Sequence, residues 1–484
     1  MSSTRTSSGW NSTSVATDRV RAPATAPPDD AALPPVRRVS SAEVARAIDG
    51  GPCVAVLDDD PTGTQTVADV PVITSWSDAD LRWALSQRTN AFFVLTNTRS
   101  LTAHDAAARN REAARGLAAA ARAMGREVVV ASRGDSTLRG YYPLETDVLA
   151  EELGPIDGVV LAPAYIEAGR VTVGSTHWMR TPSGMIPVGE TEFARDAVFG
   201  YRSSDLRDWV EEKTAGRIPS EEVLAVTLAD VRNGGPDHVA ALLATLRNGR
   251  PAVVDAMCDD DLRVLALAIV RAEAAGIRLL YRVGPSFVRA RIGQDARRPL
   301  AWPGRRTAGH GLVVIGSHVT LTTAQLEELR RLDGISEVEL SAPAALDTCS
   351  RAEHIAEVAA QAAAAMEHSD VVIRTSRTVV TGNGRDASLA VARRVSTALV
   401  ESVSAAVRSR RPAFVVAKGG ITSSDIATKS LGIRHAVARG TLLPGIVSLW
   451  EPADGPFAGV PYVVFAGNVG GTSSLAEVVK KLRR

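Results

Sequence analysis

Short apolar runs without polar interruption recur along the chain and alternate with segments rich in alanine. The clearest runs lie at 54–57, 92–95, 128–131, 158–162, 252–256 and 312–315. A strand exposed on one face alternates apolar and polar residues, so unbroken runs indicate strands covered on both faces. The segments between them, such as 104–124, space their apolar residues as helices do. This alternation predicts an α/β protein with mainly parallel sheets flanked by helices.

A segment rich in Pro, Arg and Gly breaks this alternation between 290 and 311. Further apolar runs follow it, at 312–315, 371–375, 413–417 and 462–468. A chain of 484 residues exceeds what one hydrophobic core usually organises. We therefore predict two domains, at 39–300 and 310–484, each with its own mainly parallel sheet, and a ligand cleft between them.

The first 38 residues are rich in Ser, Thr, Ala and Pro and poor in large apolar residues. Such a segment buries too little surface to offset the entropy lost on ordering, so we predict a disordered tail. A transit peptide is the alternative, because Arg5, Arg19 and Arg21 precede the first acidic pair. The segment lacks the amphipathic period and the apolar core that targeting peptides carry, and this favours the tail.

The overall charge is almost balanced, with 55 Lys and Arg against 54 Asp and Glu. A net charge of +1 argues against nucleic acid or an anionic membrane as the main partner. Cys53, Cys258 and Cys349 lie far apart, without the spacing of a zinc site or a disulfide framework. No window approaches the roughly 20 apolar residues of a membrane span. We expect a soluble, cytoplasmic protein.

Three consecutive aspartates, Asp58, Asp59 and Asp60, follow the run at 54–57 and precede a Pro-Thr-Gly turn. Ligands of open α/β sheets bind beyond the carboxyl ends of the strands. The residues after the next two runs are also polar, and they include Arg99, Arg133, Gly134, Asp135, Ser136 and Arg139. Guanidinium forks suit a carboxylate, and Asp or Ser suit hydroxyls, so the set predicts a site for a small polyhydroxy acid. A single Asp or Ser after a strand more often caps a helix, so the prediction depends on the whole set.

Turns rich in small residues follow three strands of the second half, at 316–325, 417–425 and 466–474. Small residues let backbone N–H groups approach a polyanion, and the helices that follow add a favourable dipole. These turns predict phosphate binding. Gly-Gly after a strand is also ordinary turn chemistry, and the chain contains neither GxxxxGK[ST] nor GxGxxG.

Two enzyme hypotheses follow from these two sets. In a kinase, Asp59 or Asp60 would accept the proton of a substrate hydroxyl, and Mg²⁺ would bridge the phosphates of ATP. In a phosphatase of the haloacid dehalogenase type, Asp58-x-Asp60-x-Thr62 would supply the nucleophile and its partner. No partner Lys and later Asp pair stands in the expected order, and the second half would remain unexplained. A sugar-acid sensor that binds without turnover is the third hypothesis.

The residues resemble the four-carbon acid sugar kinases, which phosphorylate threonate, erythronate or their oxo derivatives with ATP. The resemblance covers most of the chain from about residue 52. In the first half it comprises DDPTG (59–63), TNTR (96–99) and, most specifically, DSTLRG (135–140). In the second half, GSHVTLTTAQ, KGGITSSD and AGNVGG are similar to the family's GSCSxxTxxQ, GGETS and KSGNFG segments.

The resemblance implies a two-domain kinase with a sugar-acid domain at 39–300 and a nucleotide domain at 310–484. It implies substrate contacts at Asp59, Asp60, Arg99, Arg133, Gly134, Asp135 and Ser136, and ATP contacts at Ser317, Gly419, Gly420, Ile421, Thr422, Gly467 and Asn468. We add Arg139 to the substrate set, and we add His318, from its place in the first turn, to the ATP set. The expected partners are a sugar acid and ATP with Mg²⁺, and a homodimer is a candidate assembly.

The chain departs from the family pattern at positions that matter for phosphate. Arg133 stands where Lys is usual, and Ile421 replaces an acidic residue. Phe465-Ala466 replaces a Lys-Ser pair, which removes a cation from the nucleotide half. Lys418, next to the glycines, is the residue that we expect to compensate.

Overall fold

The fold is described from a computed structural model, which describes residues 32–301, 309–377, 380, 385–467 and 469–483. Its centre is one 15-stranded sheet, in the order β13-β14-β12-β15-β18-β17-β16-β2-β3-β1-β4-β11-β5-β10-β9. A second sheet, β6-β7-β8, has three antiparallel strands. The α/β class is confirmed, but the prediction of a separate sheet for each domain is wrong. The two lobes, one on either side of the β2–β16 pair, share a continuous sheet.

The strands of the large sheet, in chain order, are β1 (Cys53–Asp58), β2 (Val70–Ile73), β3 (Ala91–Leu95), β4 (Val128–Arg133), β5 (Gly158–Ala162), β9 (Leu224–Val226), β10 (Arg250–Val254), β11 (Leu279–Val283), β12 (Leu312–Ile315), β13 (Ile335–Leu340), β14 (Asp370–Thr375), β15 (Val415–Lys418), β16 (His435–Leu443), β17 (Val447–Pro452) and β18 (Tyr462–Phe465). The small sheet comprises β6 (Arg170–Val173), β7 (Thr176–Thr181) and β8 (Gly184–Pro187).

The helices, in chain order, are α1 (Ser41–Ala47), α2 (Asp78–Ser86), α3 (Ala103–Ala123), α4 (Leu144–Leu153), α5 (Leu206–Lys213), α6 (Gly235–Leu243), α7 (Asp259–Ala274), α8 (Pro285–Arg291), α9 (Thr320–Arg330), α10 (Ala342–Leu346), α11 (Arg351–Ala365), α12 (Arg385–Ser409), α13 (Gly420–Asp425) and α14 (Ser474–Arg483). None of these described helices is both long enough and apolar enough to cross a membrane.

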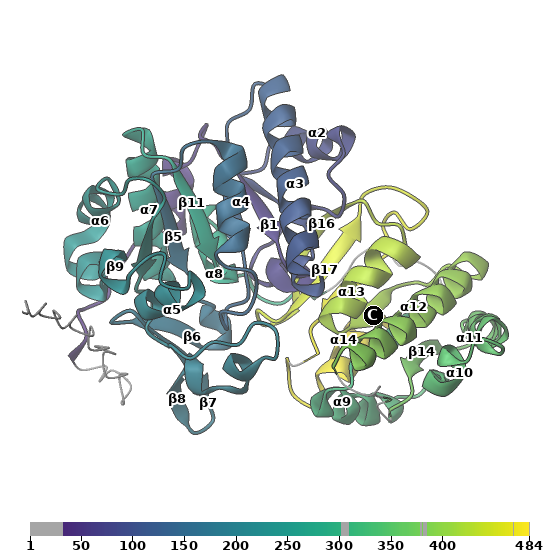
Figure 1. Cartoon of the computed structure of the whole chain (residues 1–484). Coiled ribbons are helices and arrows are strands. Elements are labelled where there is room, and N and C mark those ends of the chain that lie inside the picture. Colours follow the sequence, from purple (N-terminus) through teal and green to yellow (C-terminus); the bar gives the residue numbers. More distant parts are fainter. Residues whose placement is uncertain (1–31, 302–308, 378–379, 381–384, 468, 484) are drawn as a thin grey trace, which may run out of the picture.

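Every residue of β1 is buried, as its unbroken apolar run predicts. Ala55 and Leu57 pack with side chains of α2, α3 and α4, whereas Val54 and Val56 pack with side chains of α7 and α8. Figure 1 shows α3 and α4 in front of β1. The strands of this lobe are therefore covered by helices on both faces, which explains why their sequences do not alternate.

The second lobe is built in the same way around β12. Leu312 and Val314 pack on the face of the sheet that α11 and α12 cover. Val313 and Ile315 pack on the opposite face, with side chains of α9 and α14. β14 and β15 flank β12 in parallel.

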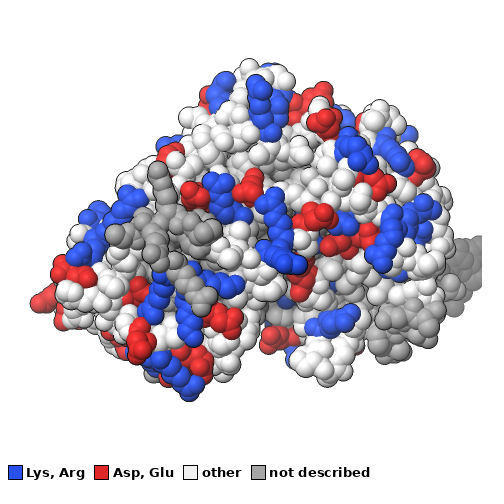
Figure 2. Space-filling model, turned by 180° about the vertical axis from the view of Figure 1, so that it is seen from behind, with Lys and Arg blue, Asp and Glu red and all other residues white. Residues whose placement is uncertain are grey.

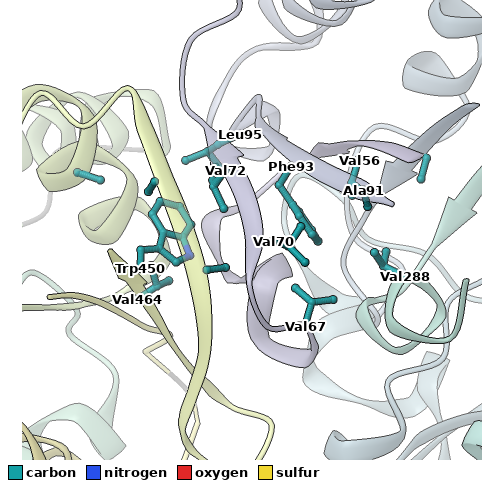
Figure 3. Close-up of a cluster of buried hydrophobic side chains, with 14 of the residues drawn as sticks. Val56, Val67, Val70, Val72, Ala91, Phe93, Leu95, Val288, Trp450 and Val464 are labelled. Atoms are coloured by element: carbon teal, nitrogen blue, oxygen red, sulfur yellow. The ribbon is translucent and has the colours of Figure 1, made fainter. Parts of the chain in front are cut away.

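The lobes join where β2 pairs antiparallel with β16, with His435 opposite Ile73 and Ala438 opposite Val70. β16 and β17 form an antiparallel hairpin that stands between the lobes (Figure 1). The hydrophobic core is continuous across the joint. Figure 3 shows Trp450 and Val464 of the second lobe beside Val70, Val72 and Phe93 of the first.

The segment predicted to be a tail falls mainly on residues 1–31, which lie outside the described residues. At its end, Arg37 donates hydrogen bonds to the carbonyl oxygens of Arg232 and Asn233, and Arg38 pairs with Asp260. The face of the molecule in Figure 2 shows basic and acidic side chains interspersed, without a large field of one sign. This agrees with the balanced charge of the sequence.

Candidate active site

The register of the first lobe brings the predicted substrate residues to one edge of the sheet. Asp58, the last residue of β1, lies opposite Leu95 of β3 and Arg133 of β4. The segments that follow these three strands therefore leave the sheet at the same level. The residues after them include Asp59, Asp60 and Arg99, which the sequence analysis singled out separately.

These segments form a network of carboxylates and guanidinium groups. Arg133 Nη1 lies 2.9 Å from Asp58 Oδ1 and 3.2 Å from Asp59 Oδ1. Arg99 lies 2.7 Å from Asp60 Oδ2 and 3.6 Å from Asp135 Oδ1. We call Asp58, Asp59, Asp60, Arg99 and Arg133 the acid cluster. Its arginines are already engaged by carboxylates of the chain itself.

The three aspartates of the acid cluster differ in their affinity for a proton. Burial raises the pKa of Asp58 to about 7 and that of Asp59 to about 6. Burial acts in the same direction on Asp60, but Arg99 and Arg133 outweigh it and lower the pKa of that carboxyl. Asp59 Oδ2 is buried and has no hydrogen-bond partner in the part of the chain that the structure describes. A buried acceptor without a donor is costly, so Asp59 is the carboxylate that a ligand hydroxyl would satisfy.

The DSTLRG segment wraps around a buried arginine that the sequence analysis did not single out. Arg282 of β11 donates to Ser132 Oγ at 2.8 Å and to Glu145 Oε2 at 2.7 Å. A Cβ on Gly134 would lie 2.4 Å from Arg282 Cζ, and one on Gly140 would lie 2.9 Å from its Nη2. Both positions need glycine because the guanidinium lies directly against the backbone.

Ser136 is held from two sides by residues near the small sheet. Arg170 Nη1 donates to Ser136 Oγ at 2.8 Å. His177 Nε2 lies 2.8 Å from the carbonyl oxygen of Ser136, and Nδ1 lies 2.9 Å from Thr172 Oγ1. Burial lowers the pKa of His177 to about 4, so it is neutral at physiological pH and carries its proton on Nε2, toward the carbonyl. His177 therefore positions the backbone at Ser136, with both of its ring nitrogens engaged by the chain.

The register of the second lobe brings its three predicted turns together in the same way. Ile315 lies opposite Lys418, and Lys418 opposite Phe465. A Cβ on Gly467 would lie 2.8 Å from Ser317 Oγ, and one on Gly419 would lie 3.2 Å from Thr422 Oγ1. The backbone of the turns is thus within reach of one ligand. Asn468, also predicted here, lies outside the described residues.

A cavity of about 130 Å³ lies beside these turns. His318, Thr375 and Thr422 line it together with apolar side chains of α12, among them Val395 and Leu399. Burial lowers the pKa of His318, and Arg377 acts in the same direction. The cavity has a polar rim at the turns and an apolar wall on α12, a combination that suits a planar heterocycle joined to a polar chain.

The two sets of predicted residues meet at one contact between the lobes. A Cβ on Gly420 would lie 2.6 Å from Asp60 Oδ2. The turn after Asp60, residues Pro61–Thr66, is itself fastened to the second lobe. Trp450 Nε1 donates to Thr64 Oγ1 at 2.8 Å, and Gln65 Nε2 to the carbonyl oxygen of Ile446 at 2.7 Å.

Two family models match the chain. The sugar-binding N-terminal domain matches residues 54–291, and the nucleotide-binding C-terminal domain matches residues 312–475. The chain belongs to the four-carbon acid sugar kinase family. The resemblance noted in the sequence is thereby confirmed.

Curated members of this family are similar over much of the chain. A D-threonate kinase of Bordetella bronchiseptica is 29% identical over 449 residues, which cover 90% of this chain and 98% of that protein. A D-erythronate kinase of Heliobacterium modesticaldum is 28% identical, covering 56% of this chain and 58% of that protein. A 3-oxo-tetronate kinase of Methylobacterium radiotolerans is 27% identical, covering 70% of this chain and 77% of that protein.

The fold is also similar to a solved structure. Haemophilus influenzae protein HI1011 superposes with a TM-score of 0.60 and 18% identity, covering 88% of this chain and 98% of that one. This likeness concerns the arrangement of the chain in space.

The departure from the four-carbon acid sugar kinase pattern at Phe465-Ala466 has a structural context. Lys418 Nζ is buried, donates to the carbonyl oxygen of Ala466 at 2.6 Å, and lies 3.8 Å from the centre of the Phe465 ring. Burial lowers the pKa of Lys418 to about 7. Its role as the compensating cation stays a prediction. Ile421, at the position of the usual acidic residue, is 55% exposed.

A second cation, which the sequence analysis missed, stands at the first turn of this lobe. Arg377 donates to the carbonyl oxygen of Ser317 and to Thr323 Oγ1, both at 2.6 Å. No carboxylate of the described residues lies within salt-bridge distance of it. No sequence motif marks Arg377, because it follows β14, which carries none of the predicted small-residue turns.

Proposed function

We propose that this protein is an ATP-dependent kinase that phosphorylates the terminal hydroxyl of a four-carbon sugar acid such as threonate, erythronate or an oxo-tetronate. The observation that carries the proposal is the contact between Gly420 and Asp60, which joins the glycine turns of one lobe to the acid cluster of the other. Phosphoryl transfer is mainly a matter of positioning, so a donor site and an acceptor site must adjoin. The curated relatives, all named as kinases of such acids, support the substrate class.

We propose that Asp59 accepts the proton of the acceptor hydroxyl. Its Oδ2 has no hydrogen-bond partner among the described residues, and its pKa of about 6 suits a base that must be ionised at neutral pH. Asp60 is instead held by Arg99 and accepts hydrogen bonds from Thr62, which favours a supporting electrostatic role. Both aspartates were predicted as catalytic, and the geometry favours this division of labour.

The proposed donor is ATP in complex with Mg²⁺. Gly419 and Gly467 lie close against Thr422 and Ser317, which brings the backbone of these turns together where phosphates could meet their N–H groups, and Arg377 adds a cation at the same turn. The cavity beside α12 would receive the adenine ring. Within the described ranges, no three His, Cys, Asp or Glu side chains gather as a metal site. Mg²⁺ would then be held largely by the phosphates, with few protein ligands.

The alternative of a phosphatase needs Asp58 as an accessible nucleophile. Asp58 Oδ1 is held by Arg133, and Gly63 lies directly against both oxygens of its carboxylate. This geometry favours a structural role for Asp58. A non-catalytic sensor would keep the substrate site but release no ADP, and it is separated from the kinase by experiment. The predicted homodimer and cytoplasmic location stay predictions.

The test is a coupled assay of ADP release with Mg-ATP and a panel of threonate, erythronate, their oxo derivatives and longer aldonates. ADP release that depends on a four-carbon acid is the expected result, and the preferred acid names the substrate. Binding of an acid without ADP release would favour the sensor. Release of phosphate from a phosphorylated acid, without ATP, would favour the phosphatase.

A further inference from the structure

Arginines lie within the acid cluster and next to it. All but one of them pair with a carboxylate of the described residues. The neutralised ones are Arg99 with Asp60, Arg133 with Asp58, Arg139 with Asp135 at 2.6 Å, and Arg282 with Glu145. Arg170 is the exception. No carboxylate of the residues that the structure describes lies within salt-bridge distance of its guanidinium.

The surroundings of Arg170 offer its guanidinium few partners in place of water. Its guanidinium carbon lies 5.7 Å from the centre of the Phe193 ring and 5.9 Å from that of Tyr165. Its Nε is buried and has no hydrogen-bond partner in the described ranges. A charged group taken out of water is expensive unless an opposite charge and hydrogen bonds compensate it.

The edge of this guanidinium that carries Nε and Nη2 is the edge with which arginines commonly bind carboxylates. Nη1 is engaged by Ser136 Oγ at 2.8 Å, whereas neither Nε nor Nη2 donates to any described residue. Parallel N–H groups on one edge of an arginine match the two oxygens of a carboxylate. The bond from Nη1 sets the orientation of Arg170, and its Nε–Nη2 edge is left without a partner among the described residues.

The geometry points to Arg170 as the anchor of the substrate carboxylate, an inference that rests on the proposed function and deepens it. A continuous set of contacts leads from Asp60 through Arg99 to Asp135, whose neighbour Ser136 binds Arg170. Asp60 marks the end of this set that touches the nucleotide lobe. An acid bound by its carboxylate at Arg170 would therefore direct its distal hydroxyl toward Asp59 and the donor phosphate.

This assignment changes the role of the arginines that the sequence singled out. Arg99 and Arg133 serve the aspartates, which without them would repel one another in a buried place. Specificity for an acid over an alditol would come from Arg170, with Ser136 as the hydroxyl beside it.

The test compares an acid with its neutral primary amide in wild type, Arg170→Met and Arg170→Lys. For Arg170→Met we expect kcat/KM for the acid to fall about 10- to 100-fold, mainly through KM, because the charge-assisted contact with the carboxylate is lost. The value for the amide should change less than about threefold, so the preference for the acid collapses. Arg170→Lys keeps the charge but not the fork and should retain part of the preference. Arg180→Met, an exposed arginine on β7, is the matched control and should behave as wild type.

Equal losses for acid and amide in Arg170→Met would mean that Arg170 only supports the fold of the site, and the inference would be overturned. Calorimetric titration of the acid and the amide without ATP separates this outcome from failure of the proposed function. Acid binding that depends on Arg170, without ADP release, would contradict the proposed kinase activity but support Arg170 as the carboxylate anchor. Acid binding with unchanged affinity in Arg170→Met would overturn the inference even in an active kinase. Absence of any acid binding to the wild type would overturn both.

Discussion

Gly420 lies so close to Asp60 that a Cβ on the glycine would stand 2.6 Å from Asp60 Oδ2. Real Cβ atoms do not approach an oxygen so closely, so any side chain at this position must push the lobes apart or displace the aspartate. The two residues are 360 positions apart in the chain, and this contact is where the candidate donor and acceptor sites adjoin.

Substitution of Gly420 by Val should therefore damage the transfer of the phosphoryl group. We expect kcat/KM for ATP to fall about 100-fold, the scale of a misplacement of reacting groups by about 1 Å. Steady-state kinetics at varied ATP measures this. Ala364→Val, at an exposed position of α11 in the same lobe, is the control and should keep wild-type kinetics. Wild-type kinetics in Gly420→Val would remove this contact from the site.

Asp59→Asn should abolish turnover while ATP binding, measured by calorimetry, stays intact. Loss of a general base typically lowers the rate by about 10²- to 10⁴-fold. Asp60→Asn should instead weaken the ion pair with Arg99. It should lower the turnover rate less than Asp59→Asn does, since we propose an electrostatic role for Asp60 and not proton transfer. A larger loss in Asp60→Asn than in Asp59→Asn would reverse the assignment.

The pH dependence of kcat/KM should show the titration of Asp59. Burial raises the pKa of this carboxyl to about 6, and only its ionised form can accept a proton. The rate should therefore be constant above about pH 7 and fall about tenfold per pH unit well below pH 6. A profile that stays flat down to pH 5 would contradict the role of Asp59 as base.

Arg377→Met should raise KM for ATP about tenfold, because it removes a cation from the turn at Ser317. KM for the sugar acid should remain unchanged, since Arg377 lies in the other lobe. Arg331→Met is a suitable control, because that side chain is 72% exposed and pairs with Glu328 on the surface. An unchanged KM for ATP would instead favour Lys418 as the cation that contacts the phosphates.

Asp80 fastens the two lobes together and should matter for stability. Its fully buried carboxylate accepts from Arg434 at 2.7 Å and lies 2.9 Å from His435 Nε2. Asp80→Asn should lower the free energy of unfolding at pH 7 by about 2 kcal/mol, the scale of lost hydrogen bonds between charged groups. Asp78→Asn, whose carboxylate is 66% exposed, should change it by less than about 0.5 kcal/mol.

The sign of the pH effect at Asp80 follows from its partners. Burial alone would raise the pKa of Asp80, but hydrogen bonds from Arg434, Ser77 and Ser75 hold it well below its usual range. A lowered carboxyl pKa stabilises the fold above the unfolded value of about 4, and this contribution is lost as the pH falls further. The difference between wild type and Asp80→Asn, followed by denaturant unfolding, should shrink below about pH 4. A difference that grows on acidification would contradict this account.

Much of the fold could be predicted because the helices and strands carry local signals. The runs at 54–57, 92–95, 128–131, 158–162, 252–256 and 312–315 coincide with β1, β3, β4, β5, β10 and β12. The small sheet and the β2–β16 pair were missed, because short strands of mixed composition lack an unbroken apolar run. The single shared sheet was missed for a different reason. Which edge strands meet is decided by packing between distant segments, and no local pattern records it.

The residues of the candidate site also fall into those that the sequence could predict and those that it could not. Asp59, Arg99 and Asp135 could be picked out because each follows an apolar run, and parallel strands end at a common edge. Arg377 lies two residues beyond the run at 371–375 and Arg170 eight residues beyond the run at 158–162, but the sequence alone does not distinguish either from a surface arginine.

By itself, the sequence determined the class of fold, the family, and the edge of the sheet at which chemistry should lie, because these depend on local composition and short motifs. Only the tertiary structure decided which charges neutralise one another, which remain free, and how the two lobes meet. An ion pair depends on distances of a few ångströms between groups far apart in the chain, and Coulomb interactions at that range are created only when the chain folds.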